Sequence, residues 1–253
     1  MKTVNSDLLG KFTQITHVFT TRKGGVSKSP YLSNNLAFHV EDHKDDVLTN
    51  HQNMSQHLDY DYKKLVHMRQ IHSDKIVIVK PTIHNFKNPP ECDALITNQP
   101  NIPLMVMTAD CSPVLFYDPK QKVIAVAHAG RAGALKGIIP KTVNKMQEVF
   151  GSELIDIQVV LGPSIGACCY EIGEKIATEV LDAGYNSAVI QKDCSFHLDV
   201  NTIIHRQLQE IGIHEEKIED INICNACENN RFFSYRADYQ KTGRMSGIIM
   251  LKK

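Results

Sequence analysis

Residues 108–133 of the 253-residue chain, TADCSPVLFYDPKQKVIAVAHAGRAG, contain two apolar runs separated by the turn residues PKQK. Two such runs joined by a short polar turn are typical of a β-hairpin. With PKQK as a four-residue loop, the register pairs Pro113 with His128. Cys111 lies two residues earlier on the same face, ~7–8 Å or less from His128 as a diagonal neighbour. The hairpin therefore predicts a thiol and an imidazole that either pack as ordinary buried residues or converge on one metal ion.

Strand-like and helix-like segments alternate around this hairpin, which favours an α/β or α+β domain with hairpin-connected strands. Further strands are expected within residues 17–25, 65–79, 92–98, 102–110, 155–162, 231–238 and 245–251. Helices are expected within residues 45–58, 133–151, 170–184 and 202–213. Pro140 should kink or split the second of these helices, because proline disrupts a helix interior.

The composition is that of an ordinary globular protein. Hydrophobic residues make up 42% of the chain, which suffices for one large domain or two small ones. Basic and acidic residues number 28 each, so nothing indicates a nucleic acid or an anionic membrane as partner. The first residues lack a signal-peptide core, and no apolar run approaches the ~20 residues that span a bilayer. We therefore expect a soluble, cytoplasmic monomer.

The seven cysteines are an odd number, and without an export signal we expect reduced thiols rather than a disulfide framework. The C-x-x-C of Cys224 and Cys227 lacks the second pair of a zinc ribbon. A strand carrying the adjacent Cys168 and Cys169 would present only one thiol on each face. We therefore expect five of the cysteines to be structural: Cys92, Cys168, Cys169, Cys194 and Cys227. Cys224 could line a site.

A third ligand for the predicted metal site is best sought among the twelve histidines. His72 interrupts two β-like runs and has polar neighbours, whereas His43, His51 and His84 lie in polar stretches and are expected at the surface. Two histidines and one cysteine leave a fourth coordination position open, which is the pattern of a catalytic zinc site. The Gly-rich turn after His128 and the GPSIG loop at 162–166 could each bind an anion or form a plain turn.

Eight motifs in order carry a resemblance to a known family: HVFTTRKGGVS, NLAFHVEDHKDDVLTN, QIHSDKI, CDALITN, TADCSPVLFYD, AVAHAGRAG, GPSIGACCYEIG and RFFSYRADYQKTGRMSGIIML. In these motifs the chain resembles the laccase-domain proteins, also called the polyphenol oxidase or multicopper-oxidase-like family, whose members are described as purine nucleoside phosphorylases. The resemblance covers nearly the whole chain. It implies an α+β fold, a single-domain sandwich of mixed β-sheets flanked by helices, over residues 1–253.

The resemblance also implies an activity and the residues that perform it. It implies that His72, Cys111 and His128 hold a metal, zinc with copper as the alternative. It implies phosphorolysis of adenosine, inosine and methylthioadenosine to the base and the ribose 1-phosphate derivative, with adenosine deamination as a further activity. Small-molecule nucleoside and phosphate would be its partners. The remaining expected site residues are Asp110, which could orient a ligand or transfer a proton, and Arg22, Asn35, Gln70, Arg131 and Arg236 as substrate contacts.

The chain departs from the family pattern around the expected anion site. The family usually has Trp-Arg-Gly after His-Ala-Gly, whereas this chain has Arg131, Ala132 and Gly133 and contains no tryptophan. Other departures are Ser73 in place of glycine, Ser164 in place of cysteine and Ala237 in place of arginine. The three expected metal ligands are retained.

Three other functions fit parts of the sequence. A copper-dependent phenol oxidase would use the same ligands, but the chain has no His-x-His pair and could hold at most a mononuclear site. A cysteine hydrolase would use Cys111 as nucleophile and His128 as base. A binding protein would keep the fold without the chemistry.

Overall fold

The predicted hairpin lies at the centre of a six-stranded mixed sheet. In a computed structural model that describes residues 1–253, the hairpin forms β6 (Ser112–Asp118) and β7 (Val123–Ala129). The strand order is β12-β8-β6-β7-β4-β3, with β12 at Ile218–Asp220, β8 at Gln158–Leu161, β4 at Ala94–Thr97 and β3 at Ile76–Ile78. The two outer pairs are parallel and the inner pairs are antiparallel.

The register of the hairpin is the predicted one. Asp118 pairs with Val123 and Pro113 pairs with His128. Even-numbered side chains of β7, such as Ile124 and Val126, point into the sandwich. Because side chains alternate along a strand, His128 shares that inward face.

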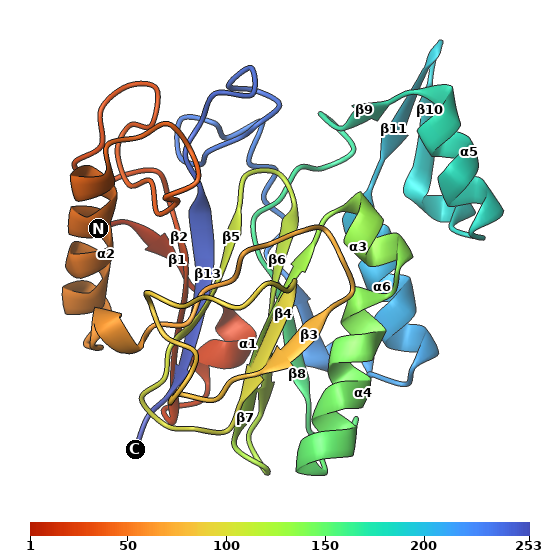
Figure 1. Cartoon of the computed structure of the whole chain (residues 1–253). Helices are drawn as coiled ribbons and strands as arrows, with labels where there is room; N and C mark the ends of the chain where they lie inside the picture. The colour runs from red at the N-terminus through yellow and green to blue at the C-terminus, as the bar shows by residue number, and fades with distance from the viewer.

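A second sheet covers this inner face. It has the order β1-β2-β13-β5, with β1 at Thr3–Val4, β2 at Ile15–Thr20, β13 at Met245–Leu251 and β5 at Leu104–Thr108. Buried apolar residues of both sheets form a shared core of 18 residues that includes Phe19, Leu115 and Ile249. The two sheets thus form a sandwich, as Figure 1 shows.

Helices cover both outer faces of the sandwich (Figure 1). The six-stranded sheet packs on α3 (Arg131–Leu135), α4 (Ile138–Phe150) and α6 (Val200–Glu210) through a core of 27 residues. On the other side lies α2 (Lys44–Leu58), and α1 is the short segment Asp7–Gly10. The predicted α+β single-domain sandwich of mixed sheets flanked by helices is therefore confirmed.

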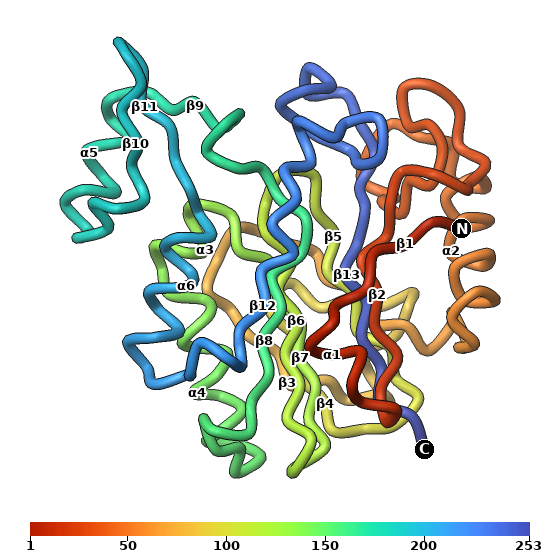
Figure 2. Tube along the Cα trace, turned by 180° about the vertical axis from the view of Figure 1, so that it is seen from behind, coloured from red at the N-terminus to blue at the C-terminus, as the bar shows by residue number.

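A small lobe projects from one end of the sandwich. It consists of α5 (Glu174–Asp182) and a three-stranded sheet of β9 (Glu171–Ile172), β10 (Val189–Lys192) and β11 (Ser195–Leu198). Figure 2 shows this lobe set apart from the two large sheets, at the same end of the molecule as the loops that precede β13. Three short 3-10 helices complete the fold at Tyr62–Lys64, Asn186–Ala188 and Glu215–Lys217.

Two expectations about local structure were wrong, and a third was confirmed with its break at another residue. Residues 231–238 form turns rather than a strand, because the Asp238 side chain accepts hydrogen bonds from Thr242 and Asn229 and folds the segment on itself. The predicted split of the helix over 133–151 is confirmed, since α3 ends at Leu135 and α4 begins at Ile138. The break lies at Gly137, whose φ is 76°, rather than at Pro140. Pro140 then lies in the first turn of α4, where no partner for its missing N–H is needed.

His51 is the second error, since it is buried rather than solvated, with 1% of its surface exposed. Its ring stacks on Phe38 and packs edge-on against Phe86. Its Nε2 atom bonds to the carbonyl oxygen of Leu36 at 2.9 Å. None of the helices combines the length and the apolar composition that a membrane-spanning segment requires.

Candidate active site

His72, Cys111 and His128 come together at one end of the sandwich. His72 lies on the loop before β3, Cys111 directly precedes β6, and His128 lies near the end of β7. Their ligand atoms all lie within 4.8 Å of one another. The two imidazole rings are 4.8 Å apart and inclined by 78°. The three residues that the sequence predicted as metal ligands are therefore neighbours in space.

Asp93 lies directly behind this cluster and is fully buried. Its Oδ1 atom is 2.9 Å from Nδ1 of His128. The same carboxylate accepts backbone N–H bonds from His72 and Ser73 at 3.1 and 2.6 Å, and the Ser73 hydroxyl at 2.7 Å. One carboxylate thus orients one histidine through its ring and the other through its backbone, and it leaves Nε2 of His128 available for a metal.

The charges in this cluster stabilise one another. Burial disfavours the ionised form of Asp93, but hydrogen bonds from His128 and Ser73 outweigh burial and lower its pKa to about 2. Burial likewise opposes the thiolate of Cys111, yet the charge and hydrogen bonds of His128 and His72 lower its pKa to about 6. The two negative partners raise the pKa of His128 to about 9 against the effect of its burial. The cluster therefore favours a thiolate, which is the form that binds metals.

Gly130 makes room for this arrangement. A Cβ atom on Gly130 would lie 2.7 Å from Sγ of Cys111 and 3.5 Å from Cδ2 of His72. The first distance is far below van der Waals contact, so any side chain here would displace the thiol. The glycine after His128 therefore permits the close approach of Cys111.

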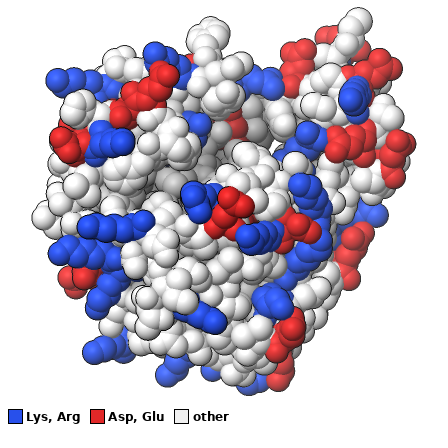
Figure 3. Space-filling view, in the orientation of Figure 1, with Lys and Arg blue, Asp and Glu red and all other residues white.

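A cavity of about 920 Å³ opens in front of the three ligands. Its wall includes the aromatic residues Phe38, Tyr170 and Tyr235. Four arginines also line it, namely Arg69, Arg131, Arg236 and Arg244. The volume falls within the ~300–1,000 Å³ typical of ligand sites. Figure 3 shows a hollow in the face that Figure 1 presents, with basic and acidic side chains intermixed around it.

Three of the five predicted substrate contacts line this cavity: Gln70, Arg131 and Arg236. Both amide atoms of Gln70 bond to the backbone of Met107, at 2.7 and 2.9 Å, so this side chain ties the cavity wall to β5. The guanidinium of Arg236 donates to the carbonyl oxygens of Cys169 and Glu171. Arg131 forms an ion pair with Glu179 on α5.

Arg22 and Asn35 lie outside the cavity lining. The Arg22 guanidinium pairs with Asp238 at 3.3 Å and donates to the carbonyl oxygens of Asn229 and Leu32. Fully buried Asn35 donates to Asp42 and accepts the backbone N–H of Arg244. These contacts hold loops in place, and substrate contact by Arg22 and Asn35 stays a prediction.

Asp110 connects three segments next to Cys111. Its carboxylate accepts the Ser234 hydroxyl and the Arg236 backbone N–H, both at 2.7 Å. Its carbonyl oxygen accepts the N–H of Ile165 at 2.8 Å. Burial raises the pKa of Asp110, although the Ser234 and Arg236 hydrogen bonds work against that rise. Asp110 lines the cavity and adopts the left-handed region with φ of 94°.

The sequence did not identify Asp93 or Arg244 as site residues. Asp93 had one available signal, a charged residue just before the apolar run of β4, where burial demands a partner. Arg244 lies between glycine and the start of β13, where a loop arginine is ordinarily solvated. Burial lowers its pKa, and its guanidinium donates to the carbonyl oxygens of Thr242 and Gly243.

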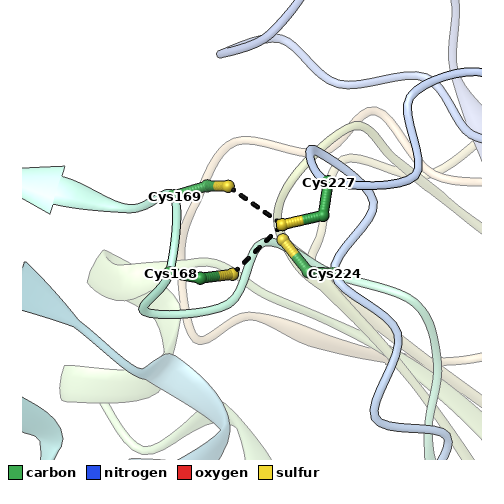
Figure 4. A group of neighbouring side chains, drawn as sticks. All are labelled: Cys168, Cys169, Cys224 and Cys227. Atoms are coloured by element: carbon green, nitrogen blue, oxygen red, sulfur yellow. Dashed lines mark hydrogen bonds between the residues drawn. The ribbon is translucent and has the colours of Figure 1, made fainter.

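The cysteines outside the cluster differ from expectation. Cys92 is buried, as predicted. Cys168, Cys169, Cys224 and Cys227, however, form a second group with sulfur atoms within 4.8 Å of one another (Figure 4). Residues 167–169 form a turn rather than a strand, so the alternation that separates adjacent side chains on a strand does not apply.

Comparison with known proteins identifies relatives along nearly the entire chain. Residues 16–252 match the family described as multi-copper polyphenol oxidoreductase laccase. A Corynebacterium glutamicum protein named purine nucleoside phosphorylase is 35% identical over 239 residues, covering 94% of this chain and 95% of the relative. The purine nucleoside phosphorylase YlmD of Bacillus subtilis is 32% identical over 244 residues, covering 93% and 88%.

The fold has a close match among solved structures. The crystal structure of the Bacillus licheniformis hypothetical protein YfiH superimposes with a TM-score of 0.88 at 34% sequence identity. The match covers 94% of this chain and 93% of that one.

Proposed function

Because the chain belongs to the multi-copper polyphenol oxidoreductase laccase family, we propose that it is a zinc-dependent purine nucleoside phosphorylase. Its substrates would be adenosine, inosine and methylthioadenosine, and adenosine deamination would be a side activity. The observation that carries the proposal is the His72, Cys111 and His128 cluster at the base of a cavity lined by arginines and aromatic rings. Relatives named purine nucleoside phosphorylase support the reaction class.

The ligand set suits zinc. His72, Cys111 and His128 would supply two nitrogens and one sulfur, and Asp93 would orient His128 from behind. Three protein ligands leave one coordination position for water or substrate. Copper accepts the same donors and is the alternative. Zinc bound there would supply Lewis acidity and lower the pKa of a coordinated water.

In phosphorolysis, a phosphate oxygen forms a bond to C1′ of the ribose while the bond from C1′ to N9 of the purine breaks. The base leaves with the bonding electron pair and takes up a proton. Arg131, Arg236 and Arg244 line the cavity and would hold the phosphate. Backbone carbonyls already fix the plane of the Arg236 guanidinium, so little side-chain entropy is lost when it binds an anion.

The aromatic residues would bind the base. Phe38, Tyr170 and Tyr235 line the same cavity, and aromatic rings stack on purines with ~1–3 kcal/mol per base. In deamination, water would add at C6 of adenosine and ammonia would leave. Asp110, whose burial raises its pKa, would move a proton between the water and the leaving amine.

Product analysis with and without phosphate tests this proposal. The zinc-loaded enzyme is expected to release adenine from adenosine only when phosphate is present, and to form inosine slowly without it. Cys111→Ala should abolish both reactions, whereas the exposed Cys194, changed to serine, should leave them intact. Folded, zinc-loaded protein that releases no adenine in phosphate would contradict the proposal.

A cysteine hydrolase is the second candidate, because the pKa of Cys111 is lowered to about 6 beside His128. A thiolate paired with a histidine is the usual nucleophile of such enzymes. Zinc would inhibit a hydrolase and activate the phosphorylase. If the chain is the proposed phosphorylase, added zinc should therefore stop the reaction of Cys111 with an alkylating probe and start phosphorolysis.

A further inference from the structure

Four cysteines outside the active site gather where two loops meet. Cys168 and Cys169 lie on the loop before β9, and Cys224 and Cys227 lie on the loop after β12. Figure 4 shows the four side chains pointing toward one another from opposite sides. The Cys227 sulfur lies 3.4 Å from that of Cys168 and 3.3 Å from that of Cys169. All four sulfur atoms lie within 4.8 Å of one another.

These spacings match one tetrahedral ion. Thiolates bound to zinc at ~2.3 Å lie ~3.8 Å from each other in a tetrahedron. The separations of 3.3 and 3.4 Å, and the limit of 4.8 Å, bracket that value. Four sulfur ligands with no open position are typical of a structural zinc site rather than a catalytic one. We infer that Cys168, Cys169, Cys224 and Cys227 bind a second zinc ion.

The backbone holds the two loops in position for this ion. The N–H of Ser164 donates to the carbonyl oxygen of Ile223, and the N–H of Asn225 donates to that of Ser164. Within the first loop, the N–H groups of Cys169 and Tyr170 both donate to the carbonyl oxygen of Gly166, which makes the turn that brings adjacent thiols to one side. These backbone hydrogen bonds align the two cysteine-bearing loops and involve no cysteine side chain.

The backbone also favours a thiolate. The N–H of Gly166 donates to Sγ of Cys224 at 3.3 Å. Amide donors stabilise negative charge on sulfur. Cys168 and Cys227 are exposed, which gives an ion an entry path.

The inferred zinc site borders the wall of the active-site cavity. Arg236 donates to the carbonyl oxygens of Cys169 and Glu171. Ile165 and Tyr170, on either side of the first cysteine pair, line the cavity. Zinc would therefore fix the loop that positions Arg236 and Tyr170. This consequence for catalysis rests on the proposed function, whereas the metal site itself does not.

Zinc content per chain tests the inference. Protein purified without chelators or oxidants is expected to hold two zinc ions, and Cys227→Ser and Cys168→Ser are each expected to hold one fewer than the wild type. Cys194→Ser, at an exposed cysteine outside the group, should match the wild type. Cys111→Ala, which lacks a ligand of the proposed active-site zinc, should also hold one zinc ion. If the proposed active-site zinc is wrong, wild type and Cys111→Ala will both hold one ion and Cys227→Ser none, which still supports this site.

Cobalt substitution identifies the ligands independently of the count. In Cys111→Ala, the charge-transfer absorption of cobalt should have the intensity of four thiolates, and Cys227→Ser in that background should abolish it. Should the serine variants fail to fold, thiol titration of the wild type decides. Five cysteines, the four of this group and Cys111, should become reactive only after a chelator removes the metal. If the proposed active-site zinc is wrong, only the four of the group should do so. Unchanged zinc in Cys227→Ser, a disulfide within the group, or four freely reactive thiols in the metal-loaded protein would each overturn the inference.

Discussion

Nδ1 of His128 lies 2.9 Å from Oδ1 of Asp93, and this contact fixes which ring nitrogen of His128 faces the cavity. Asp93 comes from the start of β4, one strand away from His128 on β7. The same carboxylate holds the loop that carries His72 through the backbone of residues 71–73. A single buried acid therefore positions two of the three proposed metal ligands.

We expect Asp93→Asn to weaken zinc binding by about 10–100-fold, the usual effect of removing the hydrogen-bond partner of a metal-bound histidine. Competition with a chromophoric chelator measures the affinity. Asp74→Asn is the control, because Asp74 lies on the same loop but pairs with Lys141 at the surface. Equal zinc affinity in Asp93→Asn and wild type would show that Asp93 does not orient a ligand.

The hairpin could be predicted because two local signals agree there, the turn and the alternation of side chains. A polar four-residue turn fixes the register, and period-2 alternation then fixes which face His128 shares. His72 could be suggested from its polar neighbours, but its place beside Cys111 depends on a chain reversal that Asp93 stabilises through long-range hydrogen bonds. No local pattern encodes that contact.

Two further features depend on contacts made by loops. Cys168 and Cys169 share one side because a turn replaces the strand that the sequence suggested. The Arg22 guanidinium contacts Asp238, a partner 216 residues later in the chain, and its contact with substrate stays a prediction. Local hydrogen bonds to the Gly166 carbonyl make the turn at the cysteines, whereas a long-range ion pair holds Arg22. Strand and helix propensities carry no information about either contact.

Gly130→Ala is expected to disrupt the active site while preserving the fold. Its Cβ atom would lie 2.7 Å from Sγ of Cys111, so the thiol must move by the order of 1 Å, a displacement that costs ~100-fold in rate. Steady-state phosphorolysis rates measure the effect, with zinc content measured in parallel. Gly173→Ala is the matched control, since no atom lies within 4 Å of the added methyl group. Wild-type rates in Gly130→Ala would contradict this account.

Arg236 and Arg22 should respond differently to truncation. Arg236→Ala removes a cavity-lining guanidinium and should raise the KM for phosphate by ~10–100-fold, the value of one charged hydrogen bond. Arg22→Ala removes the ion-pair partner of Asp238, which keeps its hydrogen bonds from Asn229 and Thr242. It should instead lower the free energy of unfolding by ~1.5–3 kcal/mol, the value of a hydrogen bond to a charged group.

Phosphate-dependent kinetics and urea unfolding separate these two effects. Arg206→Ala serves as the control for both, because its ion pair with Glu210 is exposed on α6. A phosphate KM that rises in Arg22→Ala at wild-type stability would return Arg22 to the substrate contacts. Unchanged phosphate KM in Arg236→Ala would remove Arg236 from them.

Buried His51 should make the protein sensitive to mild acid. Burial lowers its pKa from the ordinary 6.5 to about 3, so below pH 6.5 the unfolded chain binds a proton that the folded protein excludes. Stability is therefore complete above the unfolded pKa and falls with pH, by ~1.4 kcal/mol per unit for one proton, until pH approaches the folded value.

His51→Gln removes this proton and should flatten the dependence of unfolding free energy on pH between about 6.5 and 4 by up to that slope. Its absolute stability near pH 7 can fall, because Phe38 and Phe86 lose a ring to pack against; the slope is the readout. His57→Gln, at an exposed position on the same helix, should keep the wild-type slope. Parallel curves for His51→Gln and wild type would mean that His51 takes up its proton in the folded state, which its burial among the apolar rings of Phe38 and Phe86 argues against.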